Sequence, residues 1–226
     1  MTFRSLRPQS VHGRQAEARR NDLGVLEAAR DVFTAQGADA PVSAVAKHAG
    51  VGMGTLYRRY GSKTELLQRL CVLAMDQALA AADDALAASD PWDGLCGYIR
   101  ACVEMRSGAL GSLAGQIDVT DEMLRTARRG MTLAGEVVAR AHRAGSLRPD
   151  VTALDIALLI ESLSRRAPGA SGSAAPAEAD EERNAQTRLL TVAFDGLRAP
   201  GATPLPGRAP SASRYTGRWS RGPGRR

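Results

Sequence analysis

The sequence predicts an all-α protein. Alanine, leucine and arginine recur throughout the 226 residues, whereas aromatic side chains make up only 4%. Long stretches lack proline, and apolar residues return at helical spacing along most of the chain. This composition favours helices and supplies few of the residues that strands prefer.

The first helix is expected to begin at Asn21 or Asp22. Apolar positions recur from there with a helical period, and Gly37 supplies a C-terminal stop. Residues 1–20 are polar and arginine-rich, so we expect them to form a basic, flexible arm that can run into this helix and reach a DNA minor groove.

Two short helices are expected next, over residues 42–49 and 53–60. Each is too short to be stable alone, so neighbouring elements must hold it. Gly50 can take the positive φ angle that a sharp turn requires, and Ala46 is small where two helices cross closely. Two short helices joined by a glycine turn are typical of a helix-turn-helix.

The glycines at 50, 52 and 54 also raise the alternative of a loop that cradles a phosphate-bearing cofactor. A dinucleotide-binding loop requires G-x-G-x-x-G after a strand, but position 55 is threonine and residues 43–49 have a helical period. No Gly-Lys-Ser/Thr triplet occurs either. The glycines therefore favour a turn, and we expect no cofactor.

The second short helix is expected to present polar side chains outward, above Val51 and Leu56. Hydroxyls and guanidiniums suit phosphates and base edges in the major groove of DNA. Lys63 adds a charge at the start of the following helix, where backbone N–H groups already attract anions. The outward set is Met53, Thr55, Tyr57, Arg58, Arg59 and Tyr60.

The remaining helices follow from caps and apolar periods. Ser62 and Glu65 form a capping box that opens a long helix to about Ala88, which would join two domains. Further helices are expected from Asp90-Pro91, over 121–144, after Thr152 or Asp150, and over 181–197, with a loop at 167–180. We expect four parts: an arm at 1–20, a helix-turn-helix domain at 21–70, a helical regulatory and dimerisation domain at 71–198, and a disordered basic tail at 199–226.

Charge indicates the kind of partner, and cysteine content and hydropathy argue against a metal site, a secreted protein and a membrane protein. Residues 1–70 carry 11 basic and 6 acidic side chains, residues 71–198 carry 13 and 18, and residues 199–226 carry 6 and none. Basic ends favour a polyanionic partner, with solvated flexible ends as the alternative. The 3 cysteines lack metal-site spacing, and no signal peptide or membrane span is visible. We expect a soluble cytoplasmic protein with no metal and no membrane partner.

Residues 20–70 resemble the DNA-binding domain of the tetracycline-repressor (TetR) family of bacterial transcriptional regulators. The resemblance is carried by LEAARDVFTAQGADAPV, by SAVAKHAGV and by G-T-L-Y-R-R-Y-x-S-K-x-E-L. It implies that Thr55, Tyr57 and Lys63 bind operator phosphates. It also implies that Ser43, Met53 and Gly54 face the groove, whereas Arg58 and Arg59 fit either a contact or a solvated face.

The sequence departs from the family pattern at two positions. Gly52 stands where serine is frequent, which removes a side-chain cap, and Arg59 stands where histidine is common. Tyr60 matches a position that usually holds a buried phenylalanine, so we expect Tyr60 to pack inside. The base preference at the departing positions stays open.

The resemblance implies a homodimer formed through the last two helices and a small-molecule effector site in the regulatory domain. Soft pocket walls are expected among the middle helices, although each of these side chains also suits an ordinary core: Cys102, Met105, Leu113, Met123 and Met131. The three histidines are scattered and no nucleophile elbow occurs, so we expect no enzyme.

The expected function is a ligand-responsive DNA-binding transcriptional regulator, a repressor that binds a palindromic operator as a homodimer. Two alternatives stay open. One is a nonspecific DNA-binding architectural protein that acts through its basic ends. The other is a helical small-molecule-binding protein that no longer binds DNA.

Overall fold

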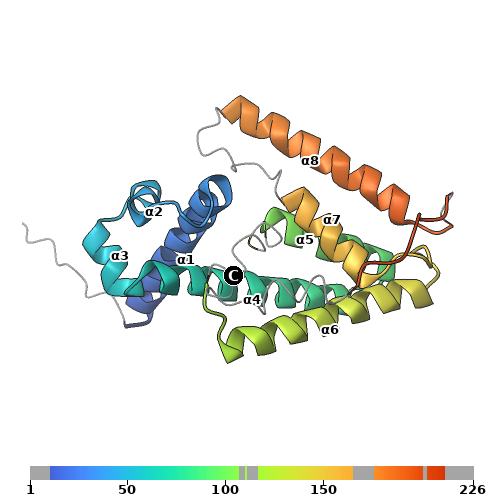
Figure 1. Cartoon of the computed structure of the whole chain (residues 1–226), viewed down its shortest axis with the longest axis horizontal. Coiled ribbons are helices and arrows are strands. Elements are labelled where there is room, and N and C mark those ends of the chain that lie inside the picture. The colour runs from blue at the N-terminus through green and yellow to red at the C-terminus, as the bar shows by residue number, and fades with distance from the viewer. Residues whose placement is uncertain (1–10, 107–109, 111–116, 165–175, 201–202, 212–226) are drawn as a thin grey trace, which may run out of the picture.

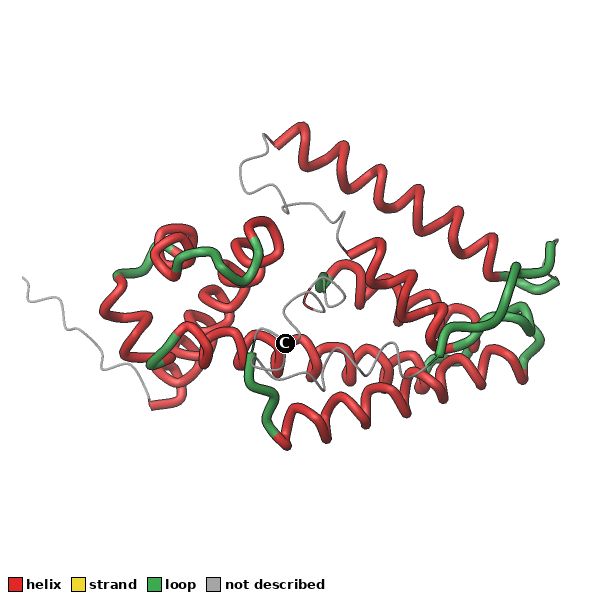
Figure 2. The backbone as a smooth tube through the Cα atoms, in the orientation of Figure 1, coloured by secondary structure: helices red, strands yellow, loops and turns green. Residues whose placement is uncertain are grey.

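The computed structural model confirms the all-α fold. It describes residues 11–106, 110, 117–164, 176–200 and 203–211, and in these residues Figure 2 shows helices and loops without strands. The described helices are α1 (Val11–Gln36), α2 (Val42–Ala49), α3 (Met53–Tyr60), α4 (Lys63–Ala87), α5 (Pro91–Glu104), α6 (Asp121–Arg143), α7 (Ala153–Ser164) and α8 (Pro176–Leu197). Figure 1 shows α1 to α3 at one end and α5 to α8 at the other, with α4 extending between them.

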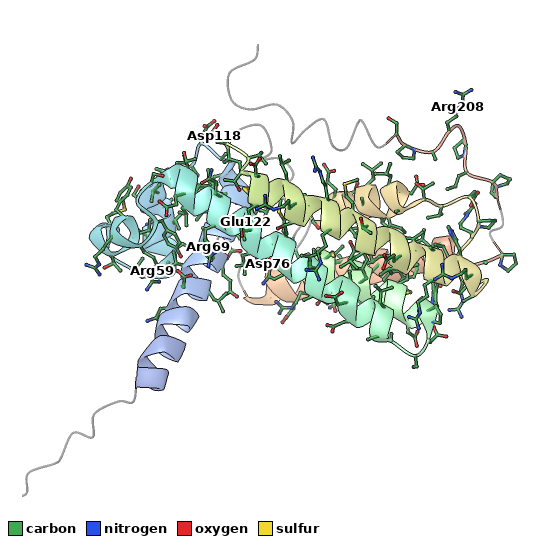
Figure 3. All side chains as sticks on the ribbon, turned by 90° about the horizontal axis from the view of Figure 1, so that it is seen from below. Arg59, Arg69, Asp76, Asp118, Glu122 and Arg208 are labelled. Atoms are coloured by element: carbon green, nitrogen blue, oxygen red, sulfur yellow. The ribbon has the colours of Figure 1, made fainter. Side chains whose placement is uncertain are left out.

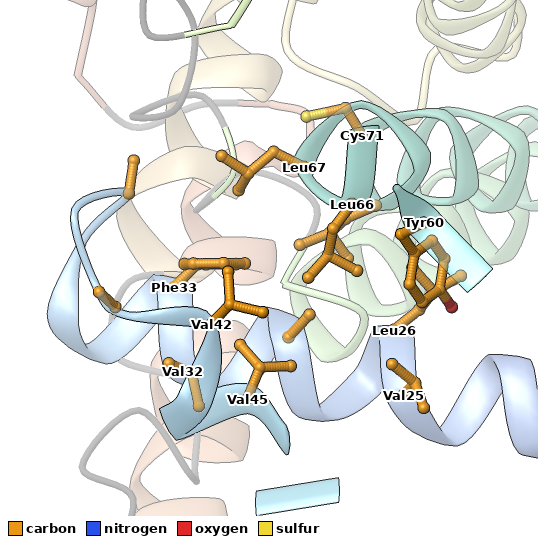
Figure 4. Close-up of a cluster of buried hydrophobic side chains, with 14 of the residues drawn as sticks. Val25, Leu26, Val32, Phe33, Val42, Val45, Tyr60, Leu66, Leu67 and Cys71 are labelled. Carbon is orange, nitrogen blue, oxygen red and sulfur yellow. The ribbon is translucent and has the colours of Figure 1, made fainter. Parts of the chain in front are cut away.

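The hydrophobic side chains form two clusters, and α4 contributes to both. The first cluster joins α1, α2 and α3 to the first half of α4, and Figure 4 shows its centre with Phe33, Val45, Tyr60 and Leu66. The second joins the last turns of α4 to α5, α6 and α7, and includes Leu95. Helices too short to stand alone are therefore held by burial against longer neighbours.

The predicted helix starts at Ser62 and Asp90 are confirmed. The hydroxyl of Ser62 accepts the N–H of Glu65 at 3.1 Å, and a carboxylate oxygen of Asp90 accepts the N–H of Asp93 at 2.8 Å. Of the two candidates before α7, Thr152 is the cap, because its hydroxyl accepts the N–H of Asp155 while the Asp155 carboxylate accepts the N–H of Thr152. Asp150 is instead paired with Arg148.

Two helix starts differ from the sequence prediction. α1 begins at Val11, about ten residues earlier than expected, and α8 begins at Pro176, so the predicted loop at 167–180 is wrong for its last five residues. Alanine, glutamate and arginine in both stretches have high helix propensity, but no apolar period marks them. Residues 1–10 and 167–175 lie outside the described residues.

The first part of the predicted tail packs against the body. Ala199 N–H donates to the Ser146 carbonyl at 3.0 Å, and Leu205 N–H donates to the Asp150 carboxylate at 2.9 Å. Arg148 also donates to the carbonyl of Thr203. Residues 203–205 therefore contact the turn between α6 and α7, so this part of the predicted disordered tail has a defined position, while residues 212–226 lie outside the described residues.

No helix in the described part of the chain is long and apolar enough to cross a membrane.

The end of α4 is closely packed against α5 and α6. A Cβ atom at Gly94 of α5 would lie 2.5 Å from the backbone oxygen of Ala85 in α4. Arg140 of α6 donates to that same oxygen at 2.9 Å and also to the carbonyl of Ala88. Terminal carbonyls of α4, which lack partners within the helix, are thus satisfied by a side chain.

We predict opposite effects for two glycine substitutions within α5. Gly94→Ala should lower the free energy of unfolding by roughly 1–3 kcal/mol, because the new methyl group would collide with a backbone oxygen that cannot rotate away. Gly97→Ala should raise it by roughly 0.5–1 kcal/mol, because no atom lies within 4 Å of its Cβ position and alanine favours the helix. Urea unfolding of both variants measures the difference; equal effects would contradict the close crossing.

Candidate nucleic-acid interface

The turn between α2 and α3 is a glycine-terminated helix end. Gly50 has φ 66° and ψ 28°, in the left-handed region. Its N–H donates to the Lys47 carbonyl at 3.3 Å, and the Val51 N–H donates to the Ala46 carbonyl at 3.0 Å. These two bonds make a Schellman motif, in which the chain changes direction at Gly50. A residue with a side chain would be strained in this conformation. The predicted turn is therefore confirmed.

The inner side of α3 is buried. Leu56 and Tyr60, one helical turn apart, lie in the first hydrophobic cluster, and Tyr60 is only 4% exposed. The Tyr60 hydroxyl donates to the Asp22 carboxylate of α1 at 2.6 Å. Burial and this bond raise the pKa of Tyr60 above its usual value, so the phenol stays protonated. This confirms the expectation that Tyr60 packs inside, and its place in the outward set of this helix is therefore wrong.

The outer side of α3 faces solvent. Tyr57 is 45% exposed and Met53 is 37% exposed. Gly54, Thr55, Arg58 and Arg59 are exposed as well, and so is Ser43 in α2. Because only Leu56 and Tyr60 are buried in this eight-residue helix, the predicted α3 contact residues share its open side.

Two of the predicted DNA-binding cations have partners within the protein. The Arg59 guanidinium lies 3.6 Å from the Asp22 carboxylate, and Figure 3 places Arg59 at the end of the molecule that carries α3. The ammonium of half-buried Lys63 lies 5.9 Å from the ring centroid of Phe33. Both side chains are long and flexible, so each can leave its partner to reach DNA.

Asp22 is a residue whose role sequence reasoning missed. It was predicted only as a possible start of the first helix, yet its carboxylate accepts from Tyr60 and pairs with Arg59. It therefore helps to hold α3 against α1. No local pattern reveals this role, because the partners lie 37 and 38 positions away in the sequence.

The four described residues among the predicted effector contacts do not belong to one hydrophobic cluster. Cys102 is buried in the second cluster, whereas Met123 is buried in the first. Met105 is half-buried at the end of α5, Met131 is 39% exposed, and Leu113 lies outside the described residues. In the described part of the chain, no group of three or more His, Cys, Asp or Glu side chains could hold a metal ion.

The two glycines of the turn should respond differently to substitution. Gly50→Ala should lower the free energy of unfolding by about 1–2 kcal/mol, because a side chain is strained in the left-handed conformation. Gly52→Ser should raise it by a few tenths of a kcal/mol, roughly the difference between serine and glycine caps, since Gly52 has φ −71° and open space at its Cβ position. Thermal unfolding of both variants tests this; a stabilising Gly50→Ala would contradict the turn geometry.

Two parts of the chain match known families. Residues 25–70 match bacterial regulatory proteins of the tetR family, and residues 90–199 match the C-terminal domain of SbtR-like transcriptional regulators. The first of these covers the end of α1, the α2–α3 turn and the start of α4. The second covers α5 to α8.

Individual proteins extend the comparison. The chain is 26% identical over 159 residues to the HTH-type transcriptional regulator UidR of Escherichia coli K12, covering 65% of this chain and 80% of UidR. It is 38% identical over 68 residues to the HTH-type regulator SAR0097 of Staphylococcus aureus, and this match spans a third of that relative's length.

A solved structure matches over nearly its whole length. The TetR transcription regulatory protein from Mycobacterium vanbaalenii is 30% identical, with a TM-score of 0.54, and the match covers 82% of this chain and 99% of that one. An exposed helix after a glycine turn, a long connecting helix and these similarities identify the chain as a member of the TetR family of bacterial transcriptional regulators.

Proposed function

We propose that this protein is a repressor that binds a palindromic operator as a homodimer and releases it when a small molecule binds. The observation that carries this proposal is the two-sided character of α3. Its inner side is anchored by Leu56 and Tyr60, while its outer side presents polar and cationic groups to solvent. A helix of this kind fits the major groove of B-form DNA.

The contacts divide into two kinds. Thr55, Tyr57 and Lys63 bind operator phosphates and set the position of α3 on the duplex. Ser43, Met53 and Gly54 face the base edges, where Gly54 allows close approach because its Cβ position is open. Arg58 and Arg59 lie on α3 together with Met53 and Gly54.

The dimer is proposed to form through α7 and α8. Large apolar side chains on these helices are exposed in the single chain: Leu158 at 37%, Leu189 at 40% and Val192 at 70%. Two copies related by a two-fold axis would bury these side chains in a four-helix interface. Such a dimer presents two α3 helices to the two halves of a palindrome.

The effector is proposed to bind in the regulatory domain, near Cys102 of α5 and Met105, which follows the last residue of α5. A ligand that fits one spacing of the two α3 helices better than another shifts the population of dimers toward that spacing. Operator affinity then falls. The protein would act in the cytoplasm, where its operator lies.

Selection of bound duplexes from a random pool tests the proposal. Recovered sequences should show two-fold symmetry, with half-sites about 34–36 Å apart, one turn of DNA. Competition with unrelated duplex provides the control. Equal affinity for random DNA would favour the architectural alternative, and no salt-dependent binding would favour the small-molecule-binding alternative.

Two substitutions test the phosphate contacts. Tyr57→Phe should weaken binding to operator and unrelated duplex alike, because it removes only a phosphate-binding hydroxyl. Lys63→Ala should also weaken both, and should lower the slope of log affinity against log salt by about one unit. Arg143→Ala, at the exposed C-terminal end of α6, is a charge-matched control for Lys63→Ala. Titration at several salt concentrations measures the effect; unchanged affinity in both variants would remove the assigned roles.

A further inference from the structure

Arg106 lies just beyond α5 and reaches α1 in the other domain. Its guanidinium donates to the Asp31 carboxylate and, at 3.3 Å, to the Thr34 hydroxyl. The residue is 9% exposed. Among the described residues other than glycine, it alone has a positive φ, 49°. A strained backbone and a buried charge therefore coincide at one contact between the domains.

Asp31 extends this contact to the helix-turn-helix. While one carboxylate oxygen accepts from Arg106, the other lies 3.1 Å from Nε2 of His48 in α2. One carboxylate on α1 therefore joins the end of α5 to the helix that precedes the glycine turn. Arg106 and His48 have this partner in common although they belong to different domains.

A second buried arginine lies beside the first. Arg30 of α1 is 7% exposed and donates to the Gln77 side chain of α4 at 2.8 Å. Burial and the nearby charge of Arg30 lower the pKa of Arg106. Asp31 supplies the carboxylate that pairs with Arg106, whereas Glu27 is the acidic group near Arg30, so withdrawal of Arg106 from Asp31 would leave the Arg106 guanidinium without its ion-pair partner.

We propose that Arg106, through Asp31 and His48, is the residue by which the regulatory domain positions α2 and α3. This rests on the proposed function, in which α3 binds the operator. Arg106 is a positioning residue, because it acts on α2 through Asp31. A movement at the end of α5 breaks the contact and loosens α2 against α1.

Hydrogen exchange of the free protein tests the connection without DNA. Arg106→Gly removes the side chain and suits φ 49°, so the backbone is not strained further. Its α2 and α3 amides, residues 42–60, should exchange faster than in the wild type, while those of the second cluster keep their rates. Arg106→Lys, which keeps a cation, should restore part of the protection. Arg129→Ala, on an exposed site of α6, is the control. Unchanged exchange at 42–60 in Arg106→Gly would overturn the proposal.

A double-mutant cycle on operator binding is the second test. Arg106→Gly and His48→Ala are combined, and affinity for the selected operator is measured for each variant. Arg106→Gly alone should lower affinity within the roughly 5- to 150-fold range of typical couplings, and the double variant should lose less than the product of the single losses. Independent losses would overturn the connection through Asp31. A wild-type protein that binds no operator would instead refute the proposed function, and hydrogen exchange would still decide the inference.

Discussion

The rest of the structure depends on one constraint: α4 contributes buried side chains to both hydrophobic clusters. The helix has 25 residues and is therefore about 37 Å long. Leu66 and Leu70 lie in the first cluster, and Ala82 and Ala85 lie in the second. Because one continuous helix supplies side chains to both, a shift of either cluster along this axis displaces the other.

The two halves of α4 pack differently because their side chains differ in size. Leucines at the start of α4 belong to the first cluster with residues of α1 and α3, as Figure 4 shows for Leu66 and Leu67. Alanines toward the end leave room for a close helix, and Gly94 of α5 lies against the backbone there. Arg140 then satisfies the last carbonyls. Close approach and capping therefore occur at the same place.

The helix α1 supports the helix-turn-helix formed by α2 and α3. Its apolar residues Val25, Leu26, Val32 and Phe33 are buried in the first cluster. Two carboxylates on α1 contact these two helices, since Asp22 accepts a hydrogen bond from Tyr60 of α3 and Asp31 pairs with His48 of α2. Apolar burial holds α2 and α3 against α1, and the directional contacts set their orientation.

The sequence by itself determined the features that depend on near neighbours. The helices, the Ser62 cap, the turn at Gly50 and the exposed side of α3 follow from spacings of a few residues, because backbone hydrogen bonds and caps are local. It missed the first ten residues of α1, where helix propensity acts without an apolar period. Tertiary structure alone decided that Asp22 and Asp31 serve the helix-turn-helix, that Arg106 crosses between domains, and that Cys102 and Met123 lie in different clusters. The contacts of Asp31 join residues 17 to 75 positions apart in the sequence. Cys102 and Met123 are both sulfur-containing side chains, yet they are buried in different places. Only the packed chain decides which of many chemically equivalent partners meet.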